Sequence, residues 1–158
     1  MKQGRRRWIA VLAGIVAVLV VGLVLLNGTR LVDRVTGWWV GGQISDAVRR
    51  TGDGEALDLA EVYEADWDSA VWVGPYADGR YGNELLGFAY FADDEMLSTD
   101  DAESRLIFVK GTDVLADVEL GPIRFPDDLT RFSRQQARFT VSHGDFYATL
   151  TPAVGARR

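Results

Sequence analysis

The sequence predicts a small α+β domain behind an apolar N-terminal segment, and three features lead to this fold class. Residues 9–26 form an uninterrupted apolar run. Residues 105–120 and 138–150 each contain two extended apolar segments around a short turn, the pattern typical of a β-hairpin. Together with an extended segment at 68–74, these hairpins predict about five strands in one small antiparallel sheet, with one or two short helices on one face.

The apolar run predicts a transmembrane signal anchor over residues 8–26. A helix of residues 9–26 is about 27 Å long, which is enough to cross a bilayer core. The run is longer than the apolar part of a typical cleaved signal peptide, and no cleavage site of small residues follows it. A cleaved signal peptide is the alternative.

Charge predicts the orientation of this anchor. Residues 1–7 hold four basic side chains and no acid, so they are expected to form a cytoplasmic segment. The remainder then lies outside the cell membrane as a single-pass protein that contacts the lipid bilayer through residues 8–26. Two pairs of small residues four apart, Ala10 with Gly14 and Ala13 with Ala17, are compatible with dimerisation but are also ordinary components of such helices.

The segment at 27–54 is expected to be a juxtamembrane helical segment and linker. Its apolar residues recur at helical spacing, and the pair Gly41 and Gly42 is expected to weaken the helix. The cluster at 51–54, Thr-Gly-Asp-Gly, predicts a boundary, after which residues 55–152 form the extracytoplasmic domain and 153–158 a tail.

Two adjacent tryptophans, Trp38 and Trp39, lie in this juxtamembrane segment. They are candidates for docking on the outer membrane surface or on a partner protein, because Trp is favoured in both places. Burial against the domain is the alternative.

Inside the domain, the segment at 68–74 is expected to be an interior strand. Val71 and Val73 fall on one face and Ala70 and Trp72 on the other, so neither face is polar. The remaining expectations are a single helical turn within 59–66, a Gly-rich loop at 76–83, a helix that gives way to a strand at 84–91, an acidic loop at 93–103 and a short helix at 127–136.

Composition excludes several classes of function. Residues 53–128 carry 20 acidic side chains against four basic ones, and such a domain repels nucleic acid. The chain has no cysteine, which removes disulfides, thiol catalysis and most structural zinc sites. No cofactor is predicted, since the glycines around Arg80 lack the Lys and Ser or Thr of a phosphate-binding loop.

Three arginines near the C-terminus, Arg131, Arg134 and Arg138, form a candidate basic surface. Such a surface would bind anionic lipid, an acidic wall polymer or the acids of a partner. Internal pairing with the excess acids of the domain is the alternative.

Asp66 and Asp68 are the candidate catalytic residues. In an extended strand their carboxylates would lie about 6 to 7 Å apart on one face, near the separation found in carboxylate-pair hydrolases. The alternative is that both acids accept backbone N–H groups around a buried Trp67. His143 is the only histidine, and its place at a hairpin end is more typical of a turn residue than of a catalytic base.

Acidic side chains in the loop at 93–103 are candidates for binding calcium, which takes six to eight oxygen ligands. No EF-hand spacing is present, and a solvated acidic loop is the alternative. The candidates are Asp93, Asp94, Asp100 and Asp101, with Glu95 and Glu103 beside them.

One resemblance is carried by Asp66-Trp67-Asp68, by the turn Gly74-Pro75-Tyr76, by the glycine after Leu86 and by the segment at 106–111. Over residues 57–150 the chain resembles a group of small, uncharacterised bacterial proteins that are exported or membrane-anchored. That resemblance implies a fold and no particular activity.

These features together favour a membrane-tethered extracytoplasmic module that binds a partner or assists another protein in the cell envelope. One alternative is an envelope hydrolase that uses Asp66 and Asp68. The other is a purely structural companion of a neighbouring membrane protein.

Overall fold

The computed structural model describes residues 32–153 of the 158-residue chain. Contacts divide the chain into two units, Met1–Val32 and Asp33–Arg158, and nearly all described residues belong to the second. The second unit begins earlier than the boundary expected at 51–54, because a helix over residues 32–50 supplies side chains to its core.

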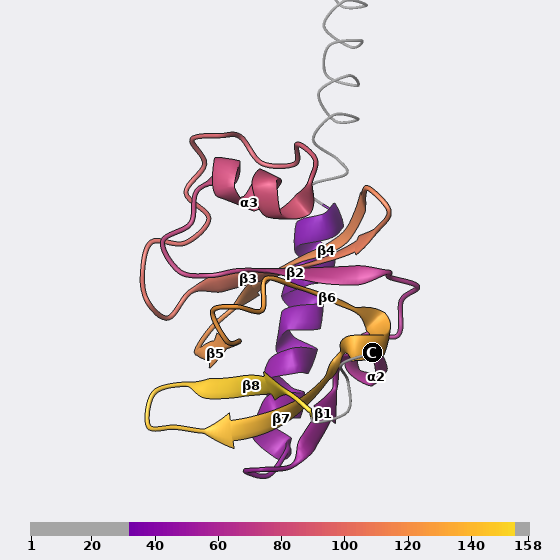
Figure 1. Cartoon of the computed structure of the whole chain (residues 1–158), viewed down its shortest axis with the longest axis vertical. Coiled ribbons are helices and arrows are strands. Elements are labelled where there is room, and N and C mark those ends of the chain that lie inside the picture. The colour runs from indigo at the N-terminus through magenta and orange to yellow at the C-terminus, as the bar shows by residue number, and fades with distance from the viewer. Residues whose placement is uncertain (1–31, 154–158) are drawn as a thin grey trace, which may run out of the picture. The chain divides into compact units, whose positions relative to one another are not determined.

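Two four-stranded sheets form the body of this unit (Figure 1). The first sheet has the order β1-β7-β8-β5 and consists of β1 (Ala56–Asp58), β7 (Arg138–His143), β8 (Ala148–Pro152) and β5 (Ile123–Arg124). The second has the order β4-β3-β2-β6 and consists of β4 (Asp113–Leu120), β3 (Ser104–Lys110), β2 (Ser69–Val73) and β6 (Arg131–Ser133). Neighbouring strands are antiparallel except β5 and β8, which are parallel.

Three shorter helical elements join the strands: α2 (Leu59–Val62), α3 (Gly79–Leu86) and the 3-10 turn η1 (Arg134–Gln136). Side chains cap the first two. The carboxylate of Asp58 accepts the N–H of Ala60 at 2.9 Å, and that of Asp78 accepts the N–H of Tyr81 at 2.9 Å. Gly87 ends α3 in the left-handed conformation, with φ of 80°.

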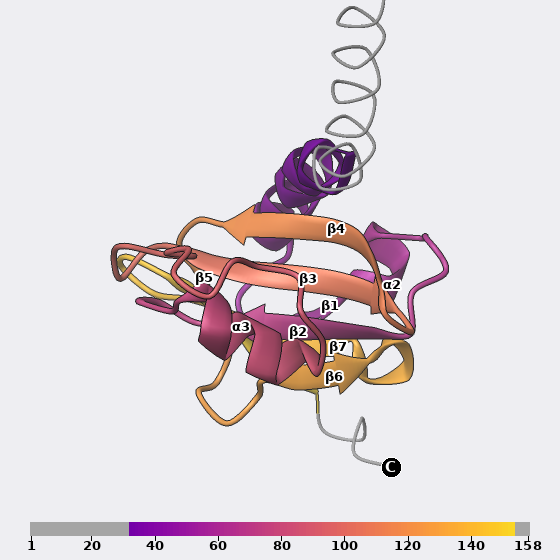
Figure 2. The same ribbon diagram turned by 90° about the horizontal axis from the view of Figure 1, so that it is seen from above.

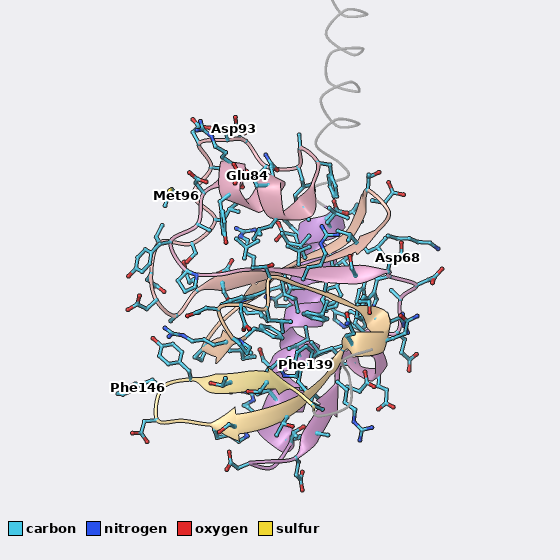
Figure 3. The ribbon with its side chains drawn as sticks, in the orientation of Figure 1. Asp68, Glu84, Asp93, Met96, Phe139 and Phe146 are labelled. Atoms are coloured by element: carbon cyan, nitrogen blue, oxygen red, sulfur yellow. The ribbon has the colours of Figure 1, made fainter. Side chains whose placement is uncertain are left out.

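The main core lies between the two sheets and is rich in aromatic rings. Phe125, Phe132 and Phe139 contact one another with ring centroids 5.0 to 5.7 Å apart. Phe139 lies on β7 and points between the sheets, whereas Phe146 projects from the tip of the β7–β8 connection (Figure 3). The helix over residues 32–50 adds Val40, Ile44 and Val48 to the same core.

A second, smaller core covers the opposite face of the β4-β3-β2-β6 sheet. Val71 and Val73 of β2 and Ile107 and Val109 of β3 pack there against α3 and the loop that follows it. Figure 2 shows α3 over this sheet near β2 and the helix over residues 32–50 beside the edge strand β4. Strand β2 is therefore buried on both faces, which confirms the prediction that it lies inside the fold.

The helix over residues 32–50 continues through Gly41 and Gly42, where a weakening was expected. The reason is close packing on the edge strand β4. A Cβ placed on Gly37 would lie 1.9 Å from the carbonyl oxygen of Asp117, so the helix reaches this distance from β4 only because residue 37 has no side chain. Gly37 and Gly41 thus place the helix against the sheet, and this packing compensates for their low helix propensity.

The α+β class and the two hairpins are confirmed, but the expected arrangement of one five-stranded sheet with short helices on one face is wrong. Residues far apart in sequence pair to give a second sheet, in which β1 joins β7 and β5 joins β8. No helix within residues 32–153 is long and apolar enough to cross a membrane. The expected anchor at 8–26 lies outside the described residues.

Three local expectations are also wrong. The segment at 84–91 was expected to change from helix to strand, but α3 ends at Leu86 and no strand follows within residues 87–91. Residues 79–82, expected in a Gly-rich loop, form the first half of α3, because Asp78 caps the helix and glycine allows close packing on Phe91 and Leu97. The segment at 127–136 holds β6 and η1 instead of a helix, since β6 pairs with the remote strand β2.

Trp67 should be a main determinant of stability. Its side chain is 1% exposed, contacts Phe108 and Phe132, and donates from Nε1 to the carbonyl of Tyr63 at 2.9 Å. We expect Trp67→Ala to lower the free energy of unfolding by about 3–5 kcal/mol in chemical denaturation followed by circular dichroism. Trp38→Ala, at a side chain that is 83% exposed, should change it by less than about 0.5 kcal/mol. A similar small loss for both variants would contradict the assigned core.

Two glycines of one helix should respond to alanine with opposite signs. Gly37→Ala introduces a methyl group against the backbone of Asp117 and should destabilise the protein by about 1–3 kcal/mol. Gly42 faces open space, so Gly42→Ala should stabilise the protein by up to about 1 kcal/mol through helix propensity. Thermal unfolding of the two variants measures both signs, and stabilisation by Gly37→Ala would show that the helix does not press on β4.

Candidate functional site

An open groove of about 710 Å³ lies between the helix over residues 32–50 and the strands β3 and β4. The helix supplies Arg34, Trp38, Trp39, Gln43, Ser45 and Asp46, and the strands supply Arg105, Asp117 and Glu119. Gly37 and Gly41 bring the helix close to β4, and Gly41 and Gly42 also belong to the groove lining.

A buried ion pair forms one part of the groove lining. Nη1 of Arg105 donates to Oδ1 and Oδ2 of Asp117 at 3.0 and 2.9 Å. Nε of Arg105 donates to the carbonyl of Leu97 at 3.0 Å, so the pair also ties the loop after α3 to the sheet. The carboxylate of Asp117 is almost fully buried. Removal of either Arg105 or Asp117 would therefore leave its partner with an uncompensated charge in the protein interior.

Two groups in the groove carry unused hydrogen-bonding capacity. Oε1 of Gln43 is buried and accepts no hydrogen bond within the described part of the chain. Glu119 is exposed, and among residues 32–153 its carboxylate has no salt-bridge partner. Arg34 and Asp46, in contrast, are paired with Glu95 and Arg49. The groove therefore offers acceptors to a ligand, because buried polar groups are normally satisfied.

Asp33 lies beside the groove and connects the helix to the loop after α3. The hydroxyl of Tyr90 donates to its Oδ2 at 3.4 Å. Partial burial raises the pKa of Asp33 above its ordinary value, the hydrogen bond from Tyr90 opposes this rise, and the nearby charge of Asp117 adds to it. The hydrogen bond from Tyr90 thus connects the first turn of the helix to the loop after α3.

The candidate catalytic acids lie elsewhere, at the tip of the β3–β4 hairpin. Asp66 forms an ion pair with Lys110, and the hydrogen bond from Lys110 lowers the pKa of Asp66. The carboxylate of Asp68 accepts the N–H of Gly111 at 2.8 Å. Both acids attach the segment around the buried Trp67 to the hairpin, and neither lines the groove. Figure 3 shows Asp68 at the end of β2, far from Asp93.

The acids considered for calcium do not converge on a common point, and at least two of them have other partners. Asp100 accepts the N–H of Ala102 at 2.7 Å and that of Glu103 at 3.0 Å, and Glu95 pairs with Arg34. Asp93 lies on the outer rim of the loop after α3 (Figure 3). Among residues 32–153, no three His or acidic side chains gather closely enough to hold a metal ion; Asp94 and Asp101 are included in that statement.

The three candidate arginines of the basic surface have different surroundings. Arg131 donates to the carbonyls of Leu85 and Leu86 at 2.8 Å and so caps the C-terminus of α3. Arg134 donates to the carbonyls of Ala65 and Ala60 and lies 5.5 Å from the ring of Trp67. Arg138 is exposed and makes no side-chain hydrogen bond or ion pair with residues 32–153. Two of the three therefore bind backbone carbonyls instead of acids.

His143 has a turn role. Its N–H donates to Asp53 at 2.8 Å, and Nε2 lies 2.9 Å from the carbonyl of Thr51. These contacts attach the end of β7 to the turn after the helix over residues 32–50.

Sequence reasoning found Trp38 and Trp39 but missed the rest of the groove. Arg105 begins a strand that was recognised by its apolar residues, and Asp117 and Glu119 are the polar positions of an alternating strand. Such positions normally face water, and no local pattern indicated that a distant helix covers this edge. Gln43 lies in a stretch predicted to be helical, but no sequence feature indicated that this helix packs on the sheet.

Arg134 and Arg138 allow a matched test of the basic surface. Arg134→Gln removes hydrogen bonds to two carbonyls and a contact with Trp67, so we expect a loss of about 1–3 kcal/mol in the free energy of unfolding. Arg138→Gln removes an exposed side chain and should change it by less than about 0.5 kcal/mol. Equal effects in urea denaturation would contradict a structural role for Arg134.

No protein-family model matches the sequence, and no curated protein or solved structure is significantly similar to it. The resemblance to small bacterial exported proteins therefore stays a prediction. The function has to be inferred from the geometry of the groove and from the composition of the chain.

Proposed function

We propose that this protein is a membrane-tethered binding module of the cell envelope and that the groove between the helix and β4 receives its partner. Attachment is assigned to the apolar run at 8–26, with residues 1–7 on the cytoplasmic side and the domain outside. The partner is a polypeptide of the envelope or of a neighbouring membrane protein.

The observation that carries this proposal is an open groove, lined by two tryptophans and several polar side chains, in which acceptor groups lack a partner among the described residues. Oε1 of Gln43 is buried without a donor, and the carboxylate of Glu119 stands unpaired within the described region. A groove of about 710 Å³ has the size of ordinary ligand sites, in which a few polar groups fix the orientation of the bound molecule. The unused groups are both acceptors, so the partner is expected to supply N–H or O–H donors.

The charge of the domain favours a partner with basic residues. Residues 53–128 hold 20 acidic side chains against four basic ones, and this field attracts a basic segment from a distance. At the groove, such a segment gains contacts with Glu119 and Asp46. Binding should therefore weaken as the salt concentration rises.

This function accounts for more of the structure than the two alternatives. A hydrolase would need a free carboxylate pair, but Lys110 binds Asp66 and the Gly111 amide binds Asp68. A purely structural companion would not need the buried, unused acceptor Oε1 of Gln43 in an open groove.

Photocrosslinking in cells tests the proposal. We expect p-benzoyl-phenylalanine at position 46 or 119 of the full-length protein to capture one discrete partner, because both side chains line the groove and are exposed. The control is position 146, which is 81% exposed at the β7–β8 tip and outside the groove. Adducts are detected by gel shift and identified by mass spectrometry.

Two results would overturn the groove as a binding surface. One is the absence of adducts at positions 46 and 119 in cells where the protein is abundant and folded. The other is the same set of adducts at position 146, since this would show collision without recognition. Glu119→Gln should reduce capture at position 46 if the carboxylate contacts the partner.

A further inference from the structure

The helix over residues 32–50 has two opposed faces in its first half. One face carries Gly37, Val40 and Ile44, which are buried against the domain. The opposite face carries Val35, Trp38 and Trp39, whose side chains are 61%, 83% and 57% exposed. Two adjacent exposed indoles and a valine form an apolar patch on a helix that is already anchored by its other side.

This exposed face changes character along the helix. At 3.6 residues per turn, Gly42, Asp46 and Arg49 continue the same side of the helix beyond Val35 and Trp39. Asp46 and Arg49 are exposed and pair with each other. The apolar patch therefore occupies only the part of the helix nearest the N-terminal run and ends abruptly at charged residues.

Chain length limits how far the patch can lie from the apolar run. Residues 27–34 separate Leu26 from Val35, and even a fully extended chain of this length spans no more than about 32 Å. If residues 8–26 lie in a bilayer, the patch is thus within about 32 Å of the end of that segment and can reach the membrane surface. Tryptophan favours this zone because its ring is apolar and its N–H requires a hydrogen-bond partner.

We infer that Val35, Trp38 and Trp39 rest in the headgroup region of the outer leaflet and fix the orientation of the domain on the membrane. This inference rests on the proposed attachment through residues 8–26. The change to Asp46 and Arg49 then marks where the helix enters water. Because Trp38 and Trp39 also line the groove, the groove lies beside the lipid surface and is positioned to receive a segment that emerges from the same membrane.

The absence of cysteine makes a direct test possible, since single cysteines can be labelled without background. Nitroxide labels are placed on Val35→Cys and Trp39→Cys, with Asp46→Cys and Arg49→Cys as controls from the same side of the helix. The full-length protein is reconstituted in vesicles of phosphatidylcholine and phosphatidylglycerol. Power saturation then compares collisions with oxygen, which enters lipid, and with a water-soluble nickel chelate.

We expect labels at positions 35 and 39 to be several-fold more accessible to oxygen than to nickel, and labels at 46 and 49 to show the reverse. Replacement of both tryptophans by serine should raise the nickel accessibility of a label at position 35. Circular dichroism of each labelled protein checks that the fold is retained.

The outcomes separate this inference from the proposed attachment. One outcome is that the protein floats with the vesicles while all four labels are equally accessible to nickel. That result would overturn the lipid contact alone. Failure to float would overturn the attachment and the lipid contact together. Protection from both reagents at positions 35 and 39 would also overturn the lipid contact, because a second protein surface would then cover the patch.

Discussion

The contact between Phe125, Phe132 and Phe139 holds the two sheets together. The three rings come from the connection after β5, from β6 and from β7, and their edge-to-face and stacked contacts continue through Trp67 and Phe108 to Tyr63. Segments too short to be stable alone, such as β5 and β6, are fixed because each carries or adjoins one of these rings. The smaller core behind β2 and β3 depends on this packing, since it uses the other face of the same strands.

The helix over residues 32–50 also stabilises the β4-β3-β2-β6 sheet, because it packs on the edge strand β4. An edge strand exposes unpaired backbone groups, and β4 is the edge of its sheet. Close approach at Gly37 covers this edge with a helix, and the same approach creates the groove with its buried Arg105 and Asp117. Protection of the sheet and formation of a candidate binding surface therefore have one cause. The same packing explains why the helix over residues 32–50 belongs to the domain, although its sequence predicted a juxtamembrane segment and linker.

Most acidic and basic side chains considered as site residues are engaged in the fold itself. Asp68 and Asp100 accept backbone N–H groups, Asp66 pairs with Lys110, and Arg131 and Arg134 donate to backbone carbonyls. A domain with short elements has many unpaired backbone groups at their ends, and charged side chains satisfy them. Among the described residues, Oε1 of Gln43 has no hydrogen-bond partner and the carboxylate of Glu119 has no salt-bridge partner, and both line the groove beside the exposed tryptophans. The groove is therefore the best candidate for a functional surface.

The sequence by itself determined the elements whose signal is local. The strand around Val71 and Trp72 and the hairpins of β3–β4 and β7–β8 follow from side-chain alternation and turn residues over a few positions. Only the tertiary structure decided that β1, β5 and β6 exist, because two or three residues carry no periodicity and pair with strands remote in sequence. It also decided that Gly37 and Gly41 strengthen a helix instead of ending it, and that Arg105 and Asp117 face a groove. Each of these features depends on a contact between distant segments. A local sequence pattern does not predict the free energy of such a contact.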